Sequence, residues 1–100
     1  MNIIMKMPNK KGMIETIIKR IENALAKDRV DIHEINGVRG VFINTIPTIE
    51  YWFPGSEEVD TLNNILSTFD YNGQKSGNLI HKMALAIALN EVKELNGRVK

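Results

Sequence analysis

The polar stretch from Asn72 to Asn78 carries the residues best suited to hold an anion. Its glycines allow close backbone approach, and free N–H groups at the start of a following helix attract negative charge. The glycine spacing of a P-loop is missing, so a flexible surface connection is the alternative interpretation. The ligand would be a nucleotide or a nucleic-acid backbone. The predicted anion-binding residues are Lys75, Ser76, Asn78, His81 and Lys82, with help from Lys10, Lys11 and Arg39.

Three consecutive aromatic residues, Tyr51, Trp52 and Phe53, form a second candidate site. With Arg39 they can build a platform for stacking a base or for contacting a protein. Core packing is the alternative, because aromatic side chains are large apolar groups that usually help to fill a core.

The middle of the chain is acidic, and Arg39 is the one basic residue between positions 31 and 60. On one shared surface, these carboxylates would imitate a phosphate backbone or dock onto a basic partner. Small inhibitors carried by phages and other mobile elements have this character by analogy. A solvated region of turns and helix caps is the alternative. The acidic residues are Asp31, Glu34, Glu50, Glu57, Glu58 and Asp60.

Catalytic and metal-binding patterns do not emerge from the sequence. The two histidines, His33 and His81, are 48 residues apart, and neither belongs to a metal-binding spacing. The chain has no cysteine, and no nucleophile, base and orienting group can be named together. We therefore expect no enzyme, no cofactor and no metal, with His81 as an acid or base being the enzymatic alternative.

Helical periodicity of apolar residues predicts three helices that would position these groups. They are expected at residues 11–28, from Ser56 to about residue 69, and at 78–95, where Asn96-Gly97 would end the last one. This last helix has no polar residue between Met83 and Leu89. It is therefore expected to be the central element or a subunit contact.

The segment between the first two helices predicts strands. Asn36-Gly37 favours a hairpin turn between strands at 30–35 and 38–46, and Pro47 separates a third strand at 48–53. The expected fold class is α+β, a three-stranded antiparallel meander with three helices in the order α-β-β-β-α-α. It would form a single domain over residues 1–100, with a loosely ordered N-terminal segment at 1–10.

Both faces of this predicted sheet would be apolar. Three helices would leave Val41, Ile43 and Trp52 uncovered on the second face, so we expect a homodimer or a larger assembly. Helices on both faces of the sheet are the alternative. The predicted partner interface comprises Arg39, Val41, Ile43, Glu50, Trp52, Glu57 and Glu58.

Composition bounds the function. The 100 residues carry a net charge of +1 and are 43% hydrophobic, which is typical of a soluble globular domain and too neutral for a protein that coats nucleic acid. Apolar runs are too short for a membrane span and no signal peptide is visible, so a cytoplasmic location is expected. The sequence predicts a small non-enzymatic module that self-associates and occupies or sequesters a protein partner. Binding of an anionic ligand at residues 72–82 is the alternative function.

Overall fold

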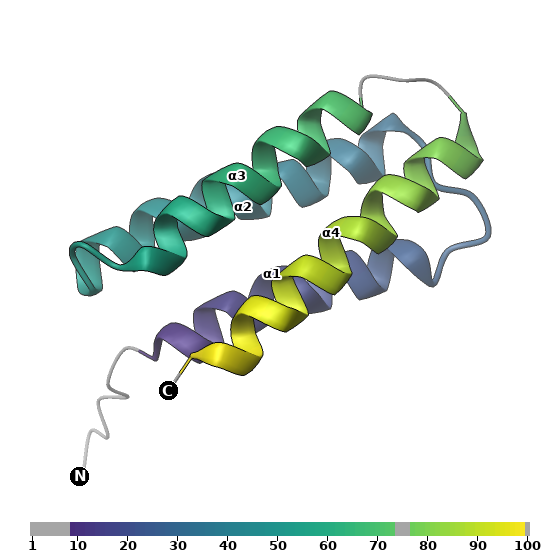
Figure 1. The fold of residues 1–100 in the computed structure, drawn as a ribbon. Helices are drawn as coiled ribbons and strands as arrows, with labels where there is room; N and C mark the ends of the chain where they lie inside the picture. Colours follow the sequence, from purple (N-terminus) through teal and green to yellow (C-terminus); the bar gives the residue numbers. More distant parts are fainter. Residues whose placement is uncertain (1–8, 74–76, 100) are drawn as a thin grey trace, which may run out of the picture.

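The computed structural model describes residues 9–73 and 77–99, apart from the side chains of residues 72 and 73. The described residues form four helices and no strand. The chain passes along the bundle four times in alternating directions, so both described ends of the chain lie at the same end of the bundle (Figure 1). The helices are α1 (Lys10–Leu25), α2 (Ile32–Trp52), α3 (Glu57–Gly73) and α4 (Asn78–Arg98).

Each helix packs against its two neighbours in a ring, α1 against α2 and α4, and α3 against α2 and α4. One stripe of apolar residues from each helix faces the centre, as expected for amphipathic helices in a bundle. Phe42 of α2 and Phe69 of α3 stack there with ring centroids 6.2 Å apart. The largest fully buried side chains are Phe42, Phe69, Ile14, Ile17, Ile21, Ile49, Leu62, Leu85, Val30, Val38 and Val92.

The predicted three-stranded meander is wrong, and with it the α+β fold class, because residues 32–52 form one helix. The buried residues of α2 step by three, four, four and three positions, which is a helical period. Asn36-Gly37 lies inside this helix instead of forming a turn, and Pro47 lies inside it on the exposed side. The buried stripe of α2 comprises Ile35, Val38, Phe42, Ile46 and Ile49.

The three helices predicted from periodicity are present with shifted ends. Helix α1 begins at Lys10, where Asn9 Oδ1 accepts a hydrogen bond from the Gly12 N–H at 3.1 Å. Residues 1–8 of the predicted loose segment lie outside the described residues. Helix α4 continues through Gly97 to Arg98, so the predicted stop at Asn96-Gly97 is wrong.

The apolar run from Met83 to Leu89 does not make α4 a central, enclosed helix, because Met83 is 56% exposed and Ile87 is 45% exposed. All four helices contribute buried residues to the core, and each also has an exposed face.

Candidate functional site

The outer face of α4 concentrates exposed apolar side chains within nine residues of sequence, from Leu79 to Ile87. Side chains three and four positions apart on a helix lie on the same face, so they form one continuous patch. Exposed apolar residues of α2 are instead spread from Ile32 to Trp52. The patch, called the α4 stripe below, comprises Leu79, Ile80, Met83, Ala86 and Ile87.

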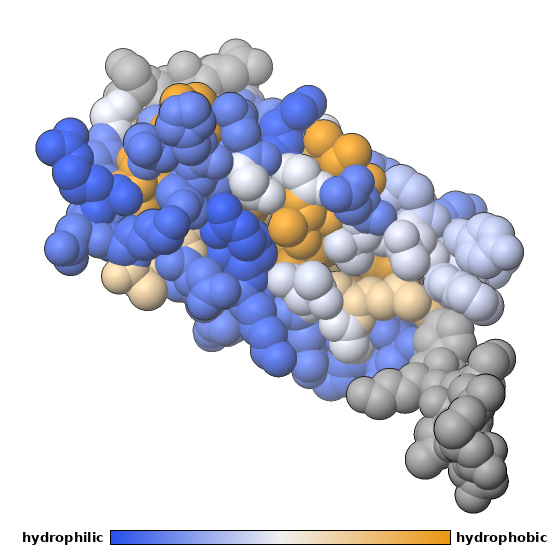
Figure 2. Space-filling model, turned by 180° about the vertical axis from the view of Figure 1, so that it is seen from behind, coloured by the Kyte–Doolittle hydropathy of each residue, from blue (hydrophilic) through white to orange (hydrophobic). Residues whose placement is uncertain are grey.

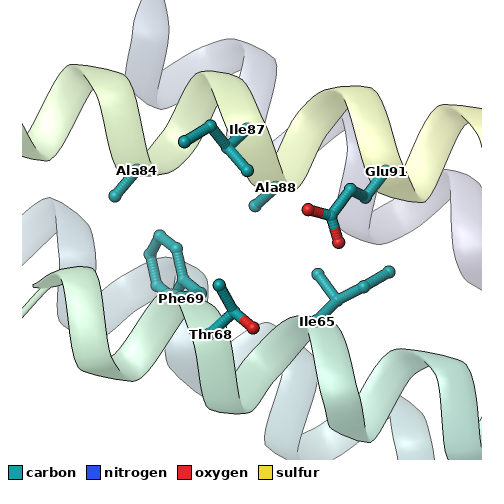
Figure 3. Close-up of a pocket in the computed structure, with 7 residues that line it drawn as sticks. All are labelled: Ile65, Thr68, Phe69, Ala84, Ile87, Ala88 and Glu91. Carbon is teal, nitrogen blue, oxygen red and sulfur yellow. The ribbon is translucent and has the colours of Figure 1, made fainter.

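A shallow groove between α3 and α4 adjoins this stripe (Figure 3). The groove is too narrow to enclose a water molecule. Ala84 and Ala88 point from α4 toward Phe69 of α3, while Glu91 extends across the groove near Ile65. Ile87 belongs both to the stripe and to the groove wall, so the two features form one surface. The groove is lined by Ile65, Thr68, Phe69, Ala84, Ile87, Ala88 and Glu91.

The opposite side of the bundle is formed by α1 and α2 (Figure 1). Seen from behind, the α1–α2 side is covered mostly by hydrophilic residues, and apolar residues gather in a band along its middle (Figure 2). The α4 stripe is an apolar surface on the outside of a helix, where solvated faces normally carry polar residues.

Three residues of the predicted anion site, all in the first turns of α4, contact the α1–α2 connection. Asn78 Oδ1 accepts from the Val30 N–H at 2.6 Å, and His81 Nδ1 lies 3.2 Å from the Val30 carbonyl oxygen. Lys82 Nζ donates to the Asp28 carbonyl at 3.0 Å. These contacts hold the start of α4 against residues 28–30, so the three side chains have a structural role.

The structure gives the remaining residues of the predicted anion site other partners or does not describe them. Lys75 and Ser76 lie outside the described residues. Lys10 pairs with Glu58 at 2.6 Å and Lys11 donates to the Asn96 carbonyl at 2.6 Å, both at the opposite end. Arg39 Nε binds Asp70 of α3 at 3.1 Å.

The residues of the predicted partner interface do not share one surface. Val41 packs against the core, whereas Ile43 and Trp52 of the same helix are exposed. Glu50 Oε1 accepts from the Gly55 N–H at 3.4 Å in the α2–α3 turn. The uncovered sheet face that would have united them does not exist, because its residues wind around one helix.

The end of the bundle near the chain termini has a hollow of about 310 Å³. It is lined by Glu57, Glu58 and Thr61 of α3 and by Leu95 and Arg98 of α4. The Glu58 carboxylate is already paired with Lys10. Helix α2 ends at the same end of the bundle (Figure 1), and its last two residues, Tyr51 and Trp52, are exposed and meet edge to face with ring centroids 5.1 Å apart.

An electrostatic cluster, in which Glu34 pairs with two cations, lies where α1 meets α2. Hydrogen bonds from Lys27 and Arg20 hold the pKa of Glu34 below its ordinary value, and the Arg20 Nη2 to Glu34 Oε2 distance is 2.9 Å. The N–H groups of Glu34 and His33 bind the Asp31 carboxylate and lower its pKa. Asp31 is the N-cap of α2, so both carboxylates stabilise the start of that helix.

Among the described residues, no group of three or more histidine, cysteine, aspartate or glutamate side chains is placed to hold a metal ion. Within the same residues, no helix has the length and apolar character needed to cross a membrane. No protein-family model, curated protein or solved structure matches the chain.

Sequence reasoning offered the last helix as a central element or a subunit contact, but none of the residues of the α4 stripe was among the predicted interface residues. The run from Met83 to Leu89 contains no polar residue, which is more apolar than one buried face requires. One helix in a ring of four hides only part of its circumference, so the remainder of such a run must be exposed.

Proposed function

We propose that this chain is a non-enzymatic protein-binding module that docks an amphipathic helix against the α4 stripe and the adjoining groove. One observation carries the proposal, the exposure of the large side chains of the stripe on the outside of α4. Contiguous exposed apolar patches on soluble domains mark interaction sites. A helix supported by α3 can receive the apolar face of another helix, with anchors spaced three and four residues apart.

The chemistry of the surface favours a protein over an anion. The stripe and the groove bring together aliphatic side chains and a thioether, and Glu91 is the one charged residue in the groove wall. Methionine adapts its shape to different apolar partners, which suits Met83 at the middle of the stripe. The predicted anion-binding side chains of α4 are engaged with the α1–α2 connection.

A photo-crosslinking amino acid placed at Met83 tests this function in cells of the native host. The matched control carries the same group at Ile43, which is 42% exposed on α2. We expect a covalent adduct with a polypeptide from position 83 and none above background from position 43. Equal yields from the two positions, or no adduct from position 83, would contradict a docking surface on α4.

A further inference from the structure

We propose that the helix received by the α4 stripe is α4 of a second copy of this chain, packed antiparallel about a two-fold axis at Met83. This inference rests on the proposed docking function and names its partner. It makes the apolar surface of α4 an isologous contact, in which the same patch serves both copies.

The stripe has the symmetry that such a contact requires. Counted from Met83, apolar exposed residues stand four and three positions before it and three and four positions after it. Antiparallel pairing about Met83 places position 83 minus k opposite position 83 plus k of the other copy. Leu79 would therefore face Ile87, Ile80 would face Ala86, and the two Met83 side chains would meet.

The size of the stripe agrees with this occupant. Its exposed side chains offer roughly 400 Å² of apolar surface, within the range of the largest patch on a typical monomer. A stable interface buries about 800 Å² on each partner, of which a little over half is apolar. The stripe therefore supplies most of the apolar area that each copy needs.

Charge does not oppose the pairing. The chain has a net charge of +1, so two copies repel each other weakly. The five positions that would meet across the axis carry no charged residue, so no ion has to be buried without a partner.

Because the chain lacks cysteine, single thiols can report the register. With oxidised glutathione, Met83→Cys should form an interchain disulfide at least about tenfold faster than Ile43→Cys, since only residues that face each other meet disulfide geometry. Mixing the Leu79→Cys and Ile87→Cys chains should give a mixed dimer faster than Leu79→Cys gives a dimer alone. In that chain the two thiols would be separated by roughly 12 Å along the helices.

Equal oxidation rates for Met83→Cys and Ile43→Cys would overturn the second copy as the occupant, and rapid self-linking of Leu79→Cys would overturn the antiparallel register. The photo-crosslink separates this inference from the function on which it rests. An adduct at position 83 with a different polypeptide, together with slow oxidation of Met83→Cys, would leave the docking function standing and remove the second copy.

Discussion

Glu34 receives two cations at the point where α1 and α2 meet, and it is the residue whose charge contributes most clearly to the fold. Its pKa lies below the ordinary value of 4.5 because Lys27 and Arg20 donate to the ionised carboxylate. A group with a lowered folded-state pKa stabilises the fold at pH values above its unfolded pKa. That contribution disappears as the pH falls through the folded-state pKa.

Glu34→Gln is therefore expected to lower the free energy of unfolding at pH 7 by on the order of 1 kcal/mol, the scale of partly exposed ion pairs. The difference from the unmodified chain should shrink as the pH falls below 4.5 and vanish once Glu34 is protonated in both states. Urea unfolding at pH 7 and at strongly acidic pH measures it. A difference of the same size at both pH values would show that shape, and not charge, is responsible.

Asn78 shows how a polar residue predicted to bind a ligand can serve the fold instead. Asn78→Ala removes the acceptor of the Val30 N–H, and Val30 is buried. An unpaired N–H in such a place costs about 1–3 kcal/mol. We expect a loss of that size in thermal or chemical unfolding, equal with and without added phosphate. A variant as stable as the unmodified chain would contradict the contact, and a loss seen only with phosphate would restore the anion site.

Among the elements, α2 is the one whose secondary structure was predicted wrongly, as strands instead of a helix. Asn36-Gly37 and a run of β-branched and aromatic residues are local signals for a hairpin, each worth about 1 kcal/mol or less. Burial of each large residue of the apolar stripe contributes about 1.5–3 kcal/mol, which outweighs them in sum. The helical period of the buried stripe of α2 was hard to recognise in the sequence, because Val41 and Ile43 are also apolar but lie outside the stripe.

Two glycines of α2 provide a matched test of its helical state. A Cβ at Gly40 meets no atom within 4 Å, so Gly40→Ala should raise the free energy of unfolding by roughly 0.5–1 kcal/mol through helix propensity alone. A Cβ at Gly37 would press on the Arg20 guanidinium, whose Cζ would be 3.2 Å away. Gly37→Ala should therefore gain less, because Arg20 is displaced from Glu34.

Denaturant unfolding of the two alanine variants measures the comparison. If residues 36–37 formed a hairpin turn, alanine at position 37 would be strongly destabilising, because such turns need positive φ. A severe loss at Gly37, or any loss at Gly40, would therefore argue against a continuous α2.

At the scale of the molecule, the helices predicted from periodic apolar residues are present. The surfaces predicted to bind partners are not. The acidic middle of the chain was expected to form one patch. Helix α2 runs roughly 30 Å between its ends, so Asp31 and Glu34 lie at one end of the bundle and Glu57 and Glu58 at the other. Residues at the two ends of a long helix lie far apart even when the sequence between them is short. Which helix faces stay exposed depends on how the four helices pack together.

The expectation of self-association came from an apolar surface that three helices were thought unable to cover. That surface was placed on a sheet that does not exist. An uncovered apolar surface is nevertheless present on α4, and part of the run that marks it was visible in the sequence. Self-association therefore remains a proposal, now based on Met83 and its neighbours.

Sedimentation equilibrium of the purified chain, with Ile87→Glu and Ile43→Glu as a matched pair, tests the α4 surface most directly. The two isoleucines are 45% and 42% exposed, so both variants should keep their helical content. We expect the unmodified chain and Ile43→Glu to form dimers with dissociation constants within about threefold of each other. Ile87→Glu should raise the constant by about 100-fold or more, the effect of losing an interface anchor. A chain that stays monomeric at all concentrations, or two variants that behave alike, would contradict pairing through α4.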